Sequence, residues 1–149
     1  MWLANSGVPP DTLTTVEQLE NWFGTYSYTG RRDGTRAELE AVRELRPLLL
    51  AVLTSDPERT VELVNKMLVE AQAVPQLVRH DGFDWHVHAV PSSADLTTRI
   101  KVETAMAMID VIRAGELSRL GVCADDDCEG VVVDLSRNRS KRYCDSRTC

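Results

Sequence analysis

The sequence predicts an α+β fold: a mostly helical N-terminal domain with one β-hairpin, followed by a small C-terminal module built on four cysteines. Apolar residues recur at helical spacing through most of the first 115 residues, interrupted by one stretch with a period of two. All four cysteines lie in the last 27 residues. We therefore expect domains at 1–115 and 121–149, joined by a linker at 116–120.

The first two helical patterns cover residues 14–26 and 35–53. Thr14 or Thr15 precedes the first apolar stripe, and threonine is a favoured capping residue. The second pattern contains Pro47, which has no backbone N–H and clashes with the preceding helical turn. We therefore expect the second pattern to be kinked or split near this proline.

Two further helices follow. The third begins at the Ser-Asp-Pro-Glu sequence of residues 55–58, which supplies a capping side chain, a proline for the first turn and an early acidic residue. We expect it to extend to about Ala73. The fourth covers residues 94–114 and ends at Gly115, because glycine readily adopts the left-handed conformation that terminates helices.

A β-hairpin is predicted between these two helices. Residues 76–80 and 84–90 flank an Asp-Gly turn, and the second segment alternates its side chains between two faces. Asp84, His86 and His88 share one face of that segment. Two such histidines and a carboxylate can hold a metal ion, and a small hydrolase could be built on them. We favour the alternative, an exposed polar face, because the sequence places no third ligand there.

The cysteines form a C-x4-C motif, an interval of 15 residues and a second C-x4-C motif. Two such pairs supply four thiolates to a tetrahedral metal, and four sulfurs favour Zn²⁺. Two disulfides or four unrelated thiols are the alternatives, but no export signal is visible and the first 122 residues contain no cysteine. A four-thiolate site has no open position for water, so we expect one structural zinc ion in a zinc-ribbon or treble-clef-like module. The expected ligands are Cys123, Cys128, Cys144 and Cys149.

The chain is acidic, with 17 Lys and Arg against 23 Asp and Glu, yet residues 137–147 carry five basic residues and one acid. Basic side chains neutralise phosphates, and a serine donates to phosphate oxygens. The alternative is local compensation of the acids at 125–127 and at Glu129. Five cations are few for tight binding by a monomer, so we expect a homodimer or a weak affinity. The expected nucleic-acid-binding residues are Arg137, Arg139, Ser140, Lys141, Arg142 and Arg147.

Other functional classes leave no clear signal in the sequence. It contains no nucleophile elbow, P-loop or dinucleotide-binding glycine pattern, so we do not expect an enzyme. The longest apolar run, 47–53, is far shorter than the roughly 20 residues needed to span a bilayer. The N-terminus has no basic region followed by an apolar core. We therefore expect a cytoplasmic protein without a membrane partner.

The C-terminal region resembles the CGNR zinc-finger family. Cys123 and Cys128 are followed by D-L-S-R-N-R-S-K-R-Y-C at 134–144 and by Cys149. The family pattern is roughly C-x4-C, then D-x-S-R-N-x-S-R-R-W-C, then C-G-N-R. Tyr143 stands where the family usually has tryptophan. The Gly-Asn-Arg that follows the last cysteine in the family lies beyond the end of this sequence, so we expect a trimmed or incomplete chain.

The rest of the chain resembles, more loosely, the ABATE domain that precedes this finger in related proteins. The matching segments are 3–6, 42–46 and 63–65. The resemblance implies a transcription regulator, described in the family as stress-induced, whose finger binds DNA. For a regulator of this kind we expect the N-terminal domain to dimerise or to sense a small-molecule effector. The alternative is a zinc-stabilised protein-interaction or small-ligand-binding module without DNA binding. Ion pairs between the basic segment and the acids at 125–127 and at Glu129 would favour that alternative.

Overall fold

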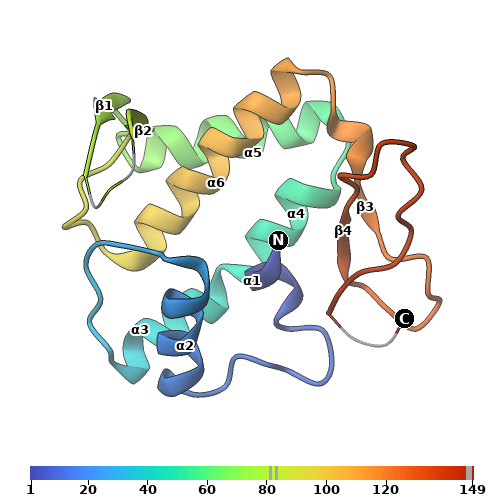
Figure 1. Cartoon of the computed structure of the whole chain (residues 1–149), viewed down its shortest axis with the longest axis horizontal. Helices are drawn as coiled ribbons and strands as arrows, with labels where there is room; N and C mark the ends of the chain where they lie inside the picture. The colour runs from blue at the N-terminus through green and yellow to red at the C-terminus, as the bar shows by residue number, and fades with distance from the viewer. Residues whose placement is uncertain (81, 83, 147–148) are drawn as a thin grey trace.

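The computed structural model describes residues 1–80, 82, 84–146 and 149. A helical body occupies the centre, and two short antiparallel hairpins lie at opposite ends of the long axis (Figure 1). The architecture is therefore the expected mostly helical N-terminal part with one hairpin, followed by a small module that contains the four cysteines. None of the helices in the described part of the chain is both long and apolar enough to cross a membrane.

The N-terminal segment forms a short helix, α1 (Trp2–Asn5), that sequence periodicity did not predict. It is followed by α2 (Val16–Tyr26), whose first turn is held by a capping box. The Thr15 side chain accepts from the backbone N–H of Gln18, and the Gln18 side chain accepts from the backbone N–H of Thr15. The predicted start and end of this helix are confirmed.

The predicted break at Pro47 is also confirmed. The pattern at 35–53 forms two helices, α3 (Arg36–Glu44) and α4 (Arg46–Thr54), with Leu45 between them. Pro47 lies in the first turn of α4, where backbone N–H groups have no partner within the helix, so its lack of an N–H costs no helical hydrogen bond.

Two long helices pack against each other and form one side of the body. They are α5 (Pro57–Glu70) and α6 (Leu96–Arg113), and each is capped by an aspartate. Asp56 accepts from the N–H of Arg59, and Asp95 accepts from the N–H of Thr98. The end of α6 was predicted correctly, because Gly115 adopts a φ of +69° just beyond it.

The predicted hairpin exists but is shorter than expected. Strand β1 (Gln76–Val78) pairs with β2 (His86–His88), and Val78 lies opposite His86. The expected Asp-Gly turn lies partly outside the described residues, since Asp81 is not among them.

A second hairpin was not predicted from the sequence. The 3-10 helix η1 (Leu117–Arg119) occupies most of the expected linker and leads into β3 (Leu120–Val122), which pairs with β4 (Val131–Val133). Strand β4 is a run of three valines that is buried on both faces at its first two positions, Val131 and Val132, so it has no alternating pattern.

The main core is continuous between the helical body and the second hairpin. Val131 is fully buried in the same apolar cluster as the helices, and both β3 and β4 pack on α4. The Asn5 side chain adds a polar link: its amide nitrogen donates to the Val131 carbonyl at 2.8 Å, and its amide oxygen accepts from the Val131 N–H at 2.6 Å. Asn5 thus satisfies both backbone groups of a buried strand residue, in the manner of a neighbouring strand.

Candidate metal centre and basic loop

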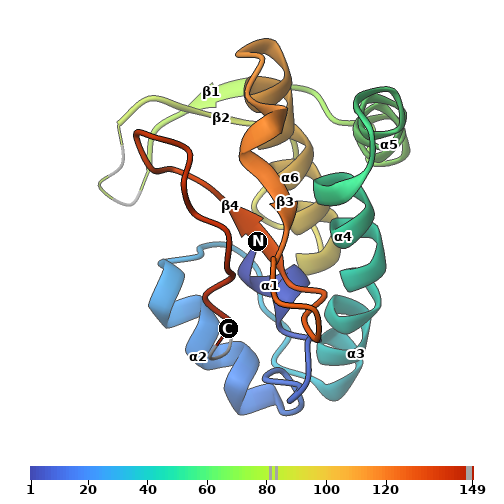
Figure 2. The same ribbon diagram turned by 90° about the vertical axis from the view of Figure 1, so that its right-hand side faces the viewer.

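The four cysteines converge around the second hairpin. Cys123 follows β3, Cys128 precedes β4, and Cys144 and Cys149 come from the segment that returns after β4. Their sulfur atoms all lie within 4.8 Å of one another, and the first three cysteines are buried. Figure 2 shows how the returning segment brings the C-terminus back beside this hairpin.

The sulfur separations fit a tetrahedral metal. The Sγ of Cys144 lies 3.6 Å from both the Cys128 and the Cys149 Sγ atoms. A Zn–S bond of about 2.3 Å places tetrahedral sulfurs about 3.8 Å apart, whereas a disulfide requires about 2.05 Å. All four cysteines are free thiols. The donor set and spacing therefore fit one structural zinc ion.

Backbone donors complete the surroundings of the sulfurs. The Gly130 N–H donates to the Cys128 Sγ at 3.4 Å, and the Cys144 N–H donates to the Cys123 Sγ at 3.3 Å. Such donors stabilise the negative charge of metal-bound thiolates. Gly130 is also confined by the cluster, because a Cβ at this position would lie 2.9 Å from the Cys144 Sγ. Sequence reasoning passed over this glycine, although its place between a cysteine and a buried strand was visible.

The thiols do not ionise equally in the absence of a cation. Burial opposes the ionisation of Cys144, but the Ser146 backbone N–H and the neighbouring thiols outweigh it and lower its pKa to about 7. Burial, followed by the neighbouring thiols of the other three cysteines, raises the pKa of Cys149. A divalent ion in the centre removes this difference in ionisation, because it allows all four sulfurs to bind as thiolates.

A basic loop, residues 136–142, leaves the hairpin after β4 and is held by the buried carboxylate of Asp134. One Asp134 oxygen accepts from the Ser136 N–H at 2.8 Å and from the Ser136 hydroxyl, and the other accepts from the Lys141 N–H at 3.0 Å. The Ser136 hydroxyl in turn accepts from the Ser140 N–H at 3.0 Å. The hydrogen bond from the Ser136 hydroxyl is the main reason that the pKa of Asp134 is lowered.

Arg119 ties the same loop to the end of the helical part. Its guanidinium donates to the carbonyls of Asp134 and Ser136 at 3.0 and 3.2 Å and pairs with Glu116. The loop is therefore fixed from two sides, by Asp134 from within and by Arg119 from outside.

The described basic side chains of this loop fall into two groups. Arg137 and Arg142 are exposed and form no ion pair with any described residue. Arg139, at a φ of +52°, donates to Glu116 and to the Ser118 hydroxyl, each at 2.9 Å. Lys141 pairs with Asp145. The side chain of Ser140 donates to Asn138 and is exposed, and Arg147 lies outside the described residues.

Two family models match the chain. The model for ABATE, described as "Putative stress-induced transcription regulator", matches residues 2–115. The chain belongs to the ABATE family. The model for the CGNR zinc finger matches residues 119–149, which contain all four cysteines and the basic loop. A search of curated proteins finds no match to the chain. The resemblance seen in the sequence is thereby confirmed for both parts.

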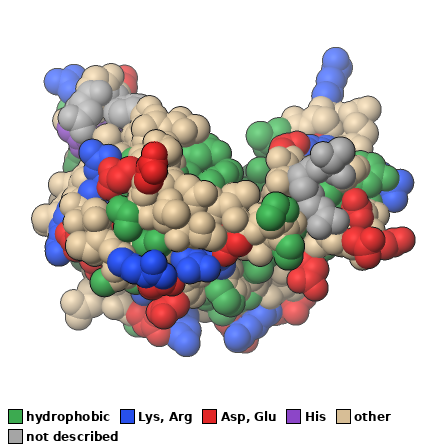
Figure 3. All heavy atoms as spheres, turned by 90° about the horizontal axis from the view of Figure 1, so that it is seen from below, with side chains coloured by type: hydrophobic (Ala, Val, Ile, Leu, Met, Phe, Trp, Pro, Cys, Tyr) green, Lys and Arg blue, Asp and Glu red, His purple; other side chains and the backbone are tan. Residues whose placement is uncertain are grey.

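The acidic residues around the first cysteine pair of the finger do not pair with the basic loop. Asp126, Asp127 and Glu129 are exposed, and Figure 3 shows acidic side chains gathered at the end of the molecule that the finger forms. They line a cavity of about 620 Å³ that is also lined by Arg43 and Arg46 of the ABATE domain. Both arginines pair with Asp11.

The histidines of the first hairpin are also brought together, but with a partner that the sequence did not indicate. His86 and His88 lie with His80, and the three offer ligand nitrogens within 4.8 Å of one another. The Asp84 carboxylate instead accepts from the Trp85 N–H at 2.8 Å. His80 was missed because it lies beyond β1, and only the register of the hairpin brings it back toward β2.

Proposed function

We propose that this ABATE-family protein is a cytoplasmic, DNA-binding transcription regulator whose CGNR finger contacts the phosphate backbone through its basic loop. The proposed contacts are Arg137, Arg139, Ser140, Lys141, Arg142 and Arg147, and the four cysteines hold the zinc without taking part in chemistry. The observation that carries the proposal is the state of Arg137 and Arg142. Both are exposed, neither forms an ion pair with a described residue, and both lie on a loop fixed by the buried Asp134.

Pre-organisation of the loop supports this function. Phosphate contacts position a protein on DNA, and they cost less ordering entropy when the cations are already held in place. Asp134, Ser136 and Arg119 supply this order without using the guanidinium groups of Arg137 and Arg142. Arg139 and Lys141 each form an ion pair near the surface. Such pairs are weak, so a phosphate group could replace the carboxylate partner.

The alternative is a zinc-stabilised protein-interaction or small-ligand-binding module. The ion pairs of Arg139 and Lys141 are the observation in its favour, because two of the described cations of the loop are already paired with carboxylates of the protein. The acids that would have supported it most strongly, at 125–127 and at Glu129, form no ion pair with the described cations of the loop. This arrangement favours the DNA-binding proposal.

The test is equilibrium binding of the zinc-loaded chain to random-sequence duplex DNA across a salt series. Removing two phosphate contacts with Arg137→Ala and Arg142→Ala together lowers the slope of log affinity against log salt by about 1.8. We expect the affinity to fall by roughly tenfold at low salt. The matched control is Arg36→Ala with Lys66→Ala, which removes the same charge from exposed positions on α3 and α5.

Two outcomes would contradict the proposal. The first is an equal loss of affinity in the control pair, which would show that net charge alone governs binding. The second is the absence of binding by the zinc-loaded protein at low salt, which would favour the interaction module. An intermediate loss with Arg139→Ala would assign part of the contact to the ion-paired group.

A further inference from the structure

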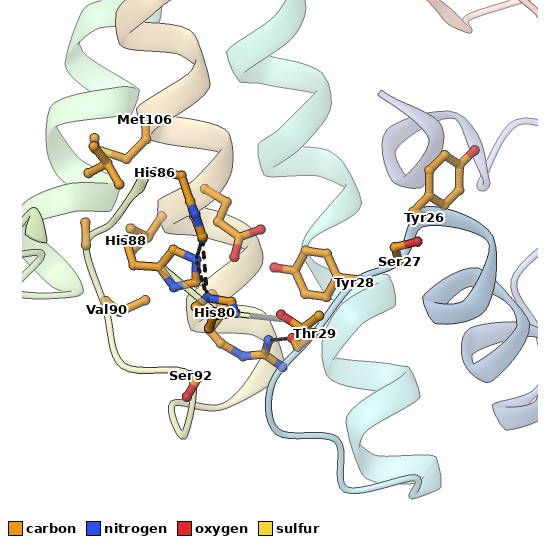
Figure 4. A pocket seen from close by; sticks show the side chains of 15 residues that line it. Tyr26, Ser27, Tyr28, Thr29, His80, His86, His88, Val90, Ser92 and Met106 are labelled. Carbon is orange, nitrogen blue, oxygen red and sulfur yellow. Dashed lines mark hydrogen bonds between the residues drawn. The ribbon is translucent and has the colours of Figure 1, made fainter. Parts of the chain in front are cut away.

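The first hairpin holds a compact group of three imidazoles. The Nε2 atoms of His86 and His88 are 3.0 Å apart, and the Nε2 of His80 lies 3.3 Å from the first and 3.4 Å from the second. A tetrahedral metal with Zn–N bonds of about 2.0–2.1 Å places its nitrogen ligands about 3.3–3.4 Å apart. Figure 4 shows the three rings pointing toward one another from the two sides of the hairpin.

The hydrogen-bond partner of one ring fixes its tautomer. The Nδ1 of His86 lies 2.7 Å from the Asp84 carbonyl oxygen, which can only accept, so this nitrogen carries the proton. In this tautomer the Nε2 of His86 is the nitrogen that can bind a metal ion, and it faces the other two rings. A carbonyl bound to the outer nitrogen is the usual second partner of a metal-binding histidine.

All three histidines are half-buried, so the group is partly shielded from solvent. The three Nε2 atoms face one another at distances at which a single metal ion can bind all three.

The open side of the group faces a cavity of about 400 Å³. Tyr28 and Glu103 line it, and Figure 4 shows the Tyr28 hydroxyl directed toward the histidine side. This hydroxyl is buried beside the Glu103 carboxyl. Burial raises the pKa of Glu103, and its interactions with the Tyr28 hydroxyl and with the charge of Arg99 partly oppose that rise. A molecule that enters the cavity can therefore meet a donor, a carboxyl group and the histidine nitrogens together.

Arg99 forms part of the cavity wall and also holds the neighbouring loop in place. Its guanidinium donates to the carbonyls of Thr29 and Arg31, which holds the 27–34 segment against α6. Gly30 is required at this contact, because a Cβ there would lie 2.5 Å from the Arg99 Nη1. The Tyr28 side of the cavity is thus fixed relative to the histidines.

The cluster is not explained by the stability of the fold. None of the described residues of β1, β2 and the segment between them belongs to the main core, and Leu77, Trp85 and Val87 are exposed. The chain has three histidines, and all three are in this group.

We propose that His80, His86 and His88 bind a divalent transition-metal ion of the zinc type, separate from the zinc of the finger, with an open coordination position that faces the cavity. The class of site follows from the ligands, since imidazole suits Zn²⁺, Cu²⁺, Ni²⁺ and Co²⁺, and three protein ligands leave a position for water or a small donor ligand. The inference does not depend on DNA binding by the finger.

The test is a titration of the zinc-loaded full chain, without an affinity tag, with Co²⁺. Zinc stays in the four-thiolate site, so we expect one further equivalent of cobalt whose visible spectrum lacks a thiolate charge-transfer band. All three histidine ring signals should shift or broaden in NMR spectra at one equivalent. His86→Gln and His88→Gln should each weaken cobalt binding more than about 100-fold, since even outer partners of metal ligands contribute about 10–100-fold.

The matched control is Leu77→Thr, which changes an exposed residue of the same hairpin and should leave cobalt binding unchanged. Azide, as a small anionic probe, should shift the visible bands of the bound cobalt if a coordination position is open. Failure of the wild-type chain to bind the additional cobalt, or cobalt binding as tight as in the wild-type chain by both histidine variants, would overturn the metal site. Visible cobalt bands that do not change when azide is added would contradict the open coordination position.

Discussion

The two hairpins of the molecule each carry a cluster of metal-binding side chain types, but they are built into the fold in opposite ways. Hairpin β3–β4 contributes Val131 to the main core, and its four cysteines surround a closed site. Hairpin β1–β2 contributes none of its described residues to that core, and its three histidines border a cavity. Of the two clusters, only the four cysteines lie in the segment that the CGNR finger model matches.

The contrast between the two clusters shows how the number of ligands determines what a bound metal can do. Four thiolates leave no coordination position, so the finger zinc serves folding and holds a surface in shape. Three imidazoles beside a cavity leave one position, so a metal there would serve binding. The fold should therefore depend strongly on the cysteine cluster and hardly at all on the histidine cluster.

The largest effect is expected from Cys144→Ser. Loss of one thiolate releases the zinc, and because Val131 is shared with the helical core, the damage should extend beyond the finger. We expect the whole chain to lose roughly 5 kcal/mol of stability, a fraction of the roughly 10–16 kcal/mol of structural zinc sites. Zinc content and thermal unfolding measure this. Retention of one full equivalent of zinc with an unchanged melting temperature would refute the four-thiolate site.

The next effect separates the polar link from the metal. Asn5→Ala leaves both backbone groups of Val131 buried without a partner, which should cost about 3 kcal/mol. Chemical denaturation of the zinc-loaded protein measures it. Asn65→Ala, at an exposed position on α5, is the matched control and should change stability by less than about 0.5 kcal/mol. Equal effects in the two variants would show that the link between α1 and β4 does not stabilise the fold.

A smaller effect is expected inside the finger. Gly130→Ala places a methyl group 2.9 Å from the Cys144 sulfur, so the cluster must shift, at a cost of about 2 kcal/mol and with weaker zinc binding. Gly121→Ala is the control within the same hairpin, because nothing lies within 4 Å of its added Cβ. Competition with a zinc chelator should distinguish the two variants, and indistinguishable zinc affinities would contradict the tight packing described here.

The smallest effect on stability is expected at the other cluster. His88→Gln in metal-free buffer should change the free energy of unfolding by less than about 0.5 kcal/mol, because the hairpin lies outside the core. The same variant should lose the rise in melting temperature that added Zn²⁺ gives the wild-type chain through mass action. A large loss of stability without metal would mean that the histidines are structural after all.

The parts of the fold that the sequence predicted rest on local signals. Thr15 caps α2, Asp56 caps α5, and Pro47 separates α3 from α4, all within one helical turn of the residues that reveal them. The cysteine spacing likewise predicted the metal cluster, since the two cysteines of each pair are only five positions apart in the sequence.

The missed features depend on contacts across the chain. Asn5 and Val131 are separated by 126 positions, so no local pattern could predict their pairing. Strand β4 is a three-residue apolar run that is too short to show a period. The addition of His80 to the other histidines required the register of β1 with β2. Asp134 was visible as part of the family motif, but its role in holding the loop appears only with its hydrogen bonds.

The proposal that the basic loop contacts DNA is tested most directly by mapping the surface that DNA covers. Random-sequence duplex is added to the zinc-loaded, isotope-labelled chain at low salt, and backbone NMR signals are followed. We predict that the signals of residues 136–142 shift most, that added salt reverses the shifts, and that the β1–β2 hairpin is unaffected. Shifts confined to the helical body, or no shifts at all, would contradict the account.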